Sequence, residues 1–305
     1  MPGAYAHMTL VNLAADENAI RQLGFREDVY EALGYYLRYA ELGAVSPDYP
    51  YLAPWYPKAK DWADKMHYVS TDGVPRQVLQ QIQGLSGNDR LKTIAWLLGY
   101  MSHVIGDVTI HPVVELKVGK YKGNEKDHRI CEMHQDVYIF RRLKIGTPEL
   151  ADHLDNNGIR GCVDNTGALD GVITNAWKRA LEAVYPESYG GNEPDPRVWH
   201  KGFGLIVDNI AEQTSFMALA RHVLPGENDG LAYPKDVKSE FIDNLKTPEG
   251  VMSYDAIFDR AINNVRTAWS WLNAAIDGDQ GQLQNLKPWD LDTGRDASGK
   301  LGMWA

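Results

Sequence analysis

Three polar residues stand at regular spacing in the most apolar stretch of the chain. His103, Asp107 and His111 form the pattern H-x3-D-x3-H among the apolar residues of 93–114. On a helix, positions four and eight residues apart lie on one face, so the three side chains would meet beside that helix. Burying them unpaired would cost several kcal/mol. A metal ion suits two imidazoles and a carboxylate, and a hydrogen-bonded core network is the structural alternative.

A second pair at helical spacing follows one loop later. His128 and Glu132 fall on one face of a helix predicted over 127–143. Such a pair alone is common on solvated helix surfaces, but its place just after the first pattern favours a shared metal site. In the same helix, His134 is expected at the surface. Asp136 either orients a metal ligand or has a structural role.

Three further candidates lie upstream, and each is weak by itself. Asp48 follows Pro47, which is typical of a turn. His67 stands among aromatic residues, as partnered and half-buried histidines often do. His7 lies close to the beginning of the sequence. The ordered set of these residues with the two helical patterns is a stronger signal than any member.

This ordered set resembles the zinc-dependent phospholipase C family over about residues 4–140. The stretches that carry the resemblance are Gly43 to Asp48, His103-Val-Ile-Gly-Asp107-Val-Thr-Ile-His111-Pro112, and His128-Arg-Ile-Cys-Glu132. The H-x3-D-x3-H spacing is similar to the branch that contains glycosylphosphatidylinositol-specific phospholipase D. Secreted bacterial phospholipases C and single-strand-specific zinc nucleases have two more residues before the last histidine. The glutamate at 132 is similar to the phospholipases, because the nucleases usually carry aspartate there.

The resemblance implies an all-α fold and a site for two to three zinc ions. The implied ligand sets are Asp48, His67, His103 and Asp107 for one ion; His111, His128 and Glu132 for a second; and His7 with a bridging Asp107 for a third. Two departures concern the third ion. Secreted relatives begin with a tryptophan that binds zinc, where this chain begins Met1-Pro2-Gly3, and they tend to have a further histidine where this chain has Asn12.

The implied activity is hydrolysis of a phosphodiester, in a phospholipid or a small-molecule phosphate ester, by metal-activated water. Asp48 is the expected catalytic residue that orients or deprotonates this water. The loops at 49–66, 117–126 and 186–200 are expected to form the pocket walls. Alternatives are a single-strand nuclease or nucleotidase, a zinc enzyme acting on a small metabolite, and a protein that keeps zinc for stability alone. An HD-type phosphohydrolase is disfavoured because Asp127 and His128 stand in the reverse order.

Helical periodicity predicts the elements that must position these residues. Apolar spacing near 3.6 predicts helices, the first capped by Asp16, over 19–23, 29–42, 75–84, 90–111, 127–143, 169–185, 203–223 and 254–276. Gly43 should stop the second helix, and Pro112 should end or kink the fourth. No period-2 alternation and no repeat are present, so we predict an all-α protein with a single domain, 1–305. The metal-site helices would lie in 1–145, the helices that complete the bundle in 146–280, and an irregular tail in 281–305.

The amino-acid composition limits the kinds of partner that the protein is expected to bind. The net charge is 31 − 41 = −10, which argues against a stable nucleic-acid partner and against attraction to anionic membranes. Two cysteines are too few for a disulfide framework. No stretch predicts a transmembrane helix, and residues 1–15 lack the features of a signal peptide, so we expect a cytoplasmic protein. A secreted protein trimmed of its leader would look the same, and oligomeric state is not visible in the sequence.

Overall fold

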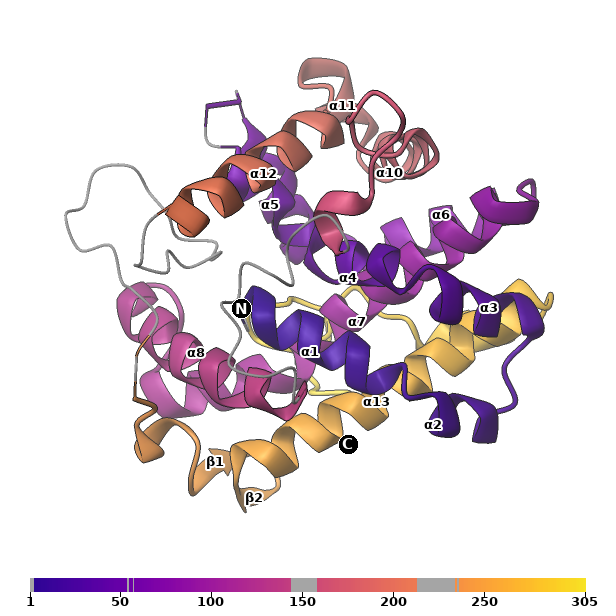
Figure 1. The fold of residues 1–305 in the computed structure, drawn as a ribbon. Helices are drawn as coiled ribbons and strands as arrows, with labels where there is room; N and C mark the ends of the chain where they lie inside the picture. Colours follow the sequence, from indigo (N-terminus) through magenta and orange to yellow (C-terminus); the bar gives the residue numbers. More distant parts are fainter. Residues whose placement is uncertain (1–2, 54, 57, 144–157, 213–233, 235) are drawn as a thin grey trace.

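The computed structural model is built almost entirely from helices (Figure 1). It describes residues 3–53, 55, 56, 58–143, 158–212, 234 and 236–305, with backbone only over 206–212. The α-helices are α1 (Ala4–Ala14), α2 (Glu17–Gln22), α3 (Glu27–Tyr35), α4 (Leu37–Val45), α5 (Ala59–Tyr68), α6 (Gly73–Ile82), α7 (Gly87–Val118), α8 (Glu125–Phe140), α10 (Gly171–Val184), α11 (Pro186–Gly191), α12 (Pro196–Glu212) and α13 (Tyr254–Ile276). Short 3₁₀ helices are η1 (Ser46–Leu52), η2 (Arg141–Leu143), η3 (Ile159–Gly161), η4 (Ser239–Phe241) and η5 (Gln280–Asn285).

Helix α7 is the centre of the fold, and α1, α3, α4, α6, α8, α10 and α13 all pack against it (Figure 1). Every residue from Thr93 to Val114 is buried, which is the mark of a core helix. The helix does not end at Pro112, which excludes one of the two predicted outcomes, and it continues to Val118. Proline removes a single backbone hydrogen bond, and the packing on all sides of α7 outweighs that loss.

Two glycines bring α4 and α7 unusually close. A Cβ atom on Gly99 would lie 1.8 Å from the carbonyl oxygen of Ala40, and one on Gly43 would lie 2.1 Å from that of Trp96. Gly43 therefore serves helix packing and does not stop the helix, which runs on to Val45. This close crossing allows backbone atoms of α4 to reach side chains of α7.

The helices otherwise follow the sequence pattern, with three differences. The stretch predicted as one helix over 29–42 divides into α3 and α4 at Tyr36, whose φ of −127° and ψ of 28° are not helical. Helix α12 begins at Pro196, earlier than predicted, since proline is well suited to the first turn of a helix. The end of the predicted helix over 203–223 lies outside the described residues. Helices α1 and α5, which carry His7 and His67, and the short helix α11 were not predicted.

A short two-stranded hairpin is a further difference from the prediction. Strands β1 (Leu245–Thr247) and β2 (Gly250–Met252) pair antiparallel, with Leu245 opposite Met252. Each strand has only three residues, so the predicted all-α class is confirmed. In the part of the chain that the structure describes, none of the helices has the length and apolar character of a membrane span.

The C-terminal tail is ordered against α7. After η5 it continues without long helices, and the side chains of Trp289, Leu291 and Trp304 are buried. The Trp304 indole donates a hydrogen bond to the Thr109 carbonyl oxygen at 2.9 Å, in the middle of the ligand-bearing part of α7. The tail is therefore part of the core.

Candidate metal centre

All eight residues predicted as metal ligands come together in the structure. A continuous series of contacts of 4.0 Å or less between imidazole nitrogens and carboxylate oxygens, or between two imidazoles, joins Asp48, His67, His103, Asp107, His7, His111, Glu132 and His128. They come from α1, η1, α5, α7 and α8, and all but Asp48 are buried. Because His128 and Glu132 are buried, they are not the solvated pair on a helix surface that such spacing commonly produces.

The first cluster consists of Asp48, His67 and His103. Asp48 Oδ1 lies 3.4 Å from His67 Nε2, which lies 3.3 Å from His103 Nε2. One ligand atom from each residue can be chosen so that all three lie within 4.8 Å of one another, a separation that one ion can span. Asp107 adjoins this cluster, with Oδ2 3.2 Å from His103 Nε2 and 3.9 Å from His67 Nε2.

Asp107 also connects the first cluster to His7. Asp107 Oδ1 lies 3.3 Å from His7 Nε2, and the His7 ring stacks on His103 with ring centroids 4.0 Å apart. His7, His103 and Asp107 form a second triplet with ligand atoms within 4.8 Å of one another. Gly106 makes room for α1, because a Cβ there would lie 2.9 Å from Leu10 and 3.4 Å from the His7 ring.

The second cluster lies one turn further along α7. His111 Nε2 is 3.8 Å from Glu132 Oε1 and 4.0 Å from Asp107 Oδ1. Glu132 Oε1 is in turn 3.9 Å from His128 Nδ1 on α8. The ligand atoms of this cluster are farther apart than the 3.3–3.4 Å separations of the first cluster. Asp107 therefore lies between the two clusters, as a bridging ligand would.

Four of the five site histidines are oriented by backbone carbonyls. His67 Nδ1 donates to Ala63 O at 2.7 Å, His103 Nδ1 to Ala44 O at 2.8 Å, and His128 Nε2 to Gly119 O at 2.6 Å. His111 Nδ1 donates to Leu291 O. A carbonyl only accepts, so the proton sits on the nitrogen that faces it. The other nitrogen of each ring keeps its lone pair and faces the carboxylates, which is the arrangement of metal-binding histidines.

Buried nitrogen and oxygen atoms that lack hydrogen bonds indicate whether these residues could hold a metal ion. Within the described residues, no hydrogen bond is made by the buried atoms His7 Nε2, Asp48 Oδ1, Asp107 Oδ1, Asp107 Oδ2 or His111 Nε2. Each such atom costs about 1–3 kcal/mol when it is left unpaired. A hydrogen-bonded core network would have paired them. Imidazole nitrogen and carboxylate oxygen are ligands that zinc prefers, so the donor set fits zinc.

Burial sets the protonation of the centre. It lowers the pKa of His7 to about 4 and that of His111 to about 3, so both are neutral at pH 7 and able to bind a metal. Burial also raises the pKa of Glu132 to about 8, so zinc binding has to displace its proton. Burial alone would raise the pKa of Asp107, but its interactions with the neighbouring histidines, His103 above all, hold it well below its ordinary value.

Two neighbours on α8 have roles that the sequence did not settle. His134 is buried, so its predicted surface position is wrong. It accepts a hydrogen bond from the Lys238 backbone at 3.2 Å and stacks on Phe241. Asp136 accepts a hydrogen bond from the Ala6 backbone N–H at 3.0 Å, at the start of α1. A carboxylate is favourable at a helix N-terminus, so Asp136 helps to fix the helix that carries His7.

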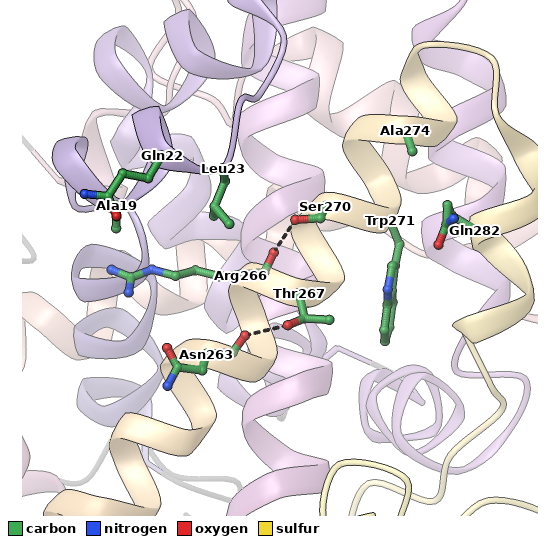
Figure 2. A pocket seen from close by; sticks show the side chains of 10 residues that line it. All are labelled: Ala19, Gln22, Leu23, Asn263, Arg266, Thr267, Ser270, Trp271, Ala274 and Gln282. Atoms are coloured by element: carbon green, nitrogen blue, oxygen red, sulfur yellow. Dashed lines mark hydrogen bonds between the residues drawn. The ribbon is translucent and has the colours of Figure 1, made fainter.

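Two grooves elsewhere among the described residues contain none of the predicted ligands. Residues of α2, α13 and η5 line one of them (Figure 2), and no predicted ligand is among them. Its hydroxyls are already used within α13, since Thr267 donates to Asn263 O and Ser270 to Arg266 O, and the Arg266 guanidinium bonds the end of α1 at Leu13 and Ala14. Another groove is lined mainly by residues of α5 and α11, among them Tyr68, next to His67. These helices belong to segments 49–66 and 186–200, which were predicted as pocket loops and are largely helical.

The helical fold and the buried centre of histidines and carboxylates define an all-α protein with a candidate zinc site. The family model for zinc dependent phospholipase C matches residues 6–187, more than half of the chain, and the protein belongs to this family. The resemblance seen over about 4–140 is thereby confirmed, and the match extends beyond it through α10. The assignment to one branch stays a prediction. Neither a curated protein nor a solved structure matches the chain significantly. Membership supports a zinc-dependent hydrolase.

Proposed function

We propose that the protein hydrolyses a phosphodiester, in a phospholipid or a related phosphate ester, with two or three zinc ions. The observation that carries the proposal is the buried Asp107 between two groups of oriented histidines, with both carboxylate oxygens free of hydrogen bonds within the described part of the chain. Zinc ions in such a centre would bind the anionic phosphate and make water acidic enough to attack it.

The proposed ligand sets remain those implied by the sequence. Asp48, His67, His103 and Asp107 would hold one ion, and His111, His128 and Glu132 a second. His7 and Asp107 would hold the third, which would have the fewest protein ligands. Three Zn²⁺ ions would carry +6 against the charge of three carboxylates, so the centre would attract an anion within an acidic protein.

Asp48 is the proposed catalytic residue. Its side chain is 14% exposed, the most of any carboxylate in the centre, so it lies where the site opens toward solvent. Although burial would raise its pKa, its interactions with the neighbouring His67 and His103 lower it, which keeps the carboxylate ionised at neutral pH. An ionised carboxylate next to a metal pair can orient the attacking water and accept its proton.

Substrate panels separate this proposal from its alternatives. The purified protein would be assayed, with zinc and with chelator, on a chromogenic phosphodiester, a phosphocholine ester and single-stranded DNA. Hydrolysis of the first two, lost with chelator and restored by zinc, is expected. Cleavage of DNA alone would favour the nuclease alternative, and bound zinc without turnover would favour a small-metabolite enzyme or structural zinc. The predicted cytoplasmic location stays a prediction.

A further inference from the structure

The proposed catalytic residue Asp48 lies on η1, a short 3₁₀ helix. Hydrogen bonds in a 3₁₀ helix have poorer geometry than those in an α-helix. Pro47 and Pro50 of η1 also have no backbone N–H to donate. The direction in which Asp48 points therefore depends on what packs against η1.

Two faces of η1 have different neighbours, because residues three apart share one face of a 3₁₀ helix. Asp48 and Tyr51 share the face toward His67. Asp48 Oδ1 lies 3.4 Å from His67 Nε2, and the Tyr51 and His67 ring centroids lie 6.2 Å apart. Ser46 and Tyr49 share another face, and both are buried. Holding this buried face in place fixes the rotation of η1, and with it the direction of Asp48.

Two other helices hold the buried face of η1. On α7, the Trp96 indole donates a hydrogen bond to Ser46 Oγ at 2.9 Å. On α12, Nδ1 of His200 and the Tyr49 hydroxyl are joined by a hydrogen bond of 3.1 Å. The Tyr49 ring also stacks on Phe203 of α12, with ring centroids 5.5 Å apart. Tyr49 therefore connects α12 to the residue next to Asp48.

Helix α12 is built to approach η1 closely, although it lies beyond residues 6–187, which match the family. A Cβ on Gly202 would lie 2.3 Å from the Leu52 carbonyl oxygen of η1. His200 is buried, and burial lowers its pKa to about 4, so the ring is neutral at pH 7. A neutral imidazole can bond the Tyr49 hydroxyl without the large cost of burying a charge.

We propose that His200 is a positioning residue of the metal centre, which acts through Tyr49 to direct Asp48 toward the zinc ion that it shares with His67 and His103. The inference deepens the proposed function, because it rests on the same zinc centre. Groups that orient a metal ligand contribute to metal affinity, so the contact should be measurable in zinc binding.

Zinc binding by Tyr49→Phe tests the proposal without any assay of turnover. The change removes one hydroxyl and keeps the ring that stacks on Phe203. We expect zinc to bind about 3- to 10-fold more weakly in competition with a chromogenic chelator. The control is Tyr39→Phe, which removes another buried hydroxyl, one that donates to Asp170 at 2.9 Å, and should leave zinc affinity unchanged.

A double-mutant cycle with Asp48→Ala separates the positioning of Asp48 from a general loss of stability. In the Asp48→Ala background, Tyr49→Phe should no longer change zinc affinity, because the carboxylate that Tyr49 directs is absent. A purely structural role would weaken zinc binding by the same factor in both backgrounds.

Two substitutions of His200 provide a rescue test. His200→Leu should weaken zinc binding in the same direction as Tyr49→Phe. His200→Asn should bind zinc more tightly than His200→Leu, because an amide can keep the hydrogen bond whether the tyrosine donates or accepts. If His200→Leu does not fold, Tyr49→Phe and the cycle decide.

Wild-type zinc affinity in Tyr49→Phe would overturn the proposal, and so would an equal loss of affinity with and without Asp48. A wild type that binds zinc but hydrolyses nothing would refute the proposed function and leave this test intact.

Discussion

The effect of the Glu132→Gln substitution on the free energy of unfolding should change sign when zinc is added. Glu132 is buried, and its pKa rises from 4.5 to about 8 in the metal-free protein. The folded state therefore binds more protons than the unfolded state between these pH values, so Glu132 makes the free energy of unfolding fall as pH rises through this range. At about 1.36 kcal/mol per pH unit, the loss is about 3 kcal/mol at pH 7 and reaches its full size above pH 8.

The assay is urea unfolding of wild type and Glu132→Gln in chelator, from pH 5 to pH 9. The glutamine amide changes the free energy of unfolding by an amount that does not depend on pH. The test is therefore how the difference in this free energy between variant and wild type changes with pH. We expect the variant to gain about 3–4 kcal/mol relative to wild type between pH 5 and pH 8. In saturating zinc the order should reverse, because the variant lacks a charged ligand.

A matched control lies on the same helix. Glu125 is exposed, and the hydrogen bond from the Gly123 N–H lowers its pKa, so it is ionised in both the folded and the unfolded chain above pH 5. Glu125→Gln should therefore give a difference from wild type that stays flat from pH 5 to pH 9. A difference between wild type and Glu132→Gln that stays flat over pH 5–8 would refute the reasoning, since it would mean that Glu132 ionises as easily in the folded as in the unfolded chain.

Three further outcomes are expected. Gly99→Ala should destabilise the protein by about 1–3 kcal/mol in urea unfolding, because its methyl group would meet the backbone of α4 at 1.8 Å, whereas Gly34→Ala, with nothing within 4 Å, should not. Zinc affinity should rise between pH 6 and pH 8 and proton release should be measurable by calorimetry in two buffers, because Glu132 has to deprotonate; affinity independent of pH would contradict this. His7→Ala should remove at most one zinc, the one shared with Asp107, and loss of all metal from a folded variant would contradict the assignment.

The ligand set could be predicted from the sequence because helical spacing converts residue numbers into positions on a face. His103, Asp107 and His111 on α7, and His128 with Glu132 on α8, needed only the 3.6-residue period. His7 and Asp48 lie outside such patterns. Their place in the set came from the family resemblance, and the structure brings them to the same centre.

The remaining parts of the site left no local signal. The Ala44 and Leu291 carbonyls that orient histidines are backbone atoms, which any residue type would supply. Gly43 was misread as a helix stop, since a glycine that admits a neighbouring helix looks the same in sequence as one that ends a helix. The tail that carries Leu291 is polar and irregular, and only its tertiary contacts with α7 show that it reaches the centre.

Zinc content and phosphodiester hydrolysis, measured on the same preparation of wild type and Asp48→Asn, test the central claim most directly. We expect two or three zinc ions in wild type, hydrolysis that chelator removes and zinc restores, and a loss of about 100-fold or more in Asp48→Asn with its fold retained. Asp48→Asn with full activity and unchanged metal content would contradict the catalytic role of Asp48. Absence of bound metal from the folded wild type, even after reconstitution with Zn²⁺, would contradict the metal centre itself.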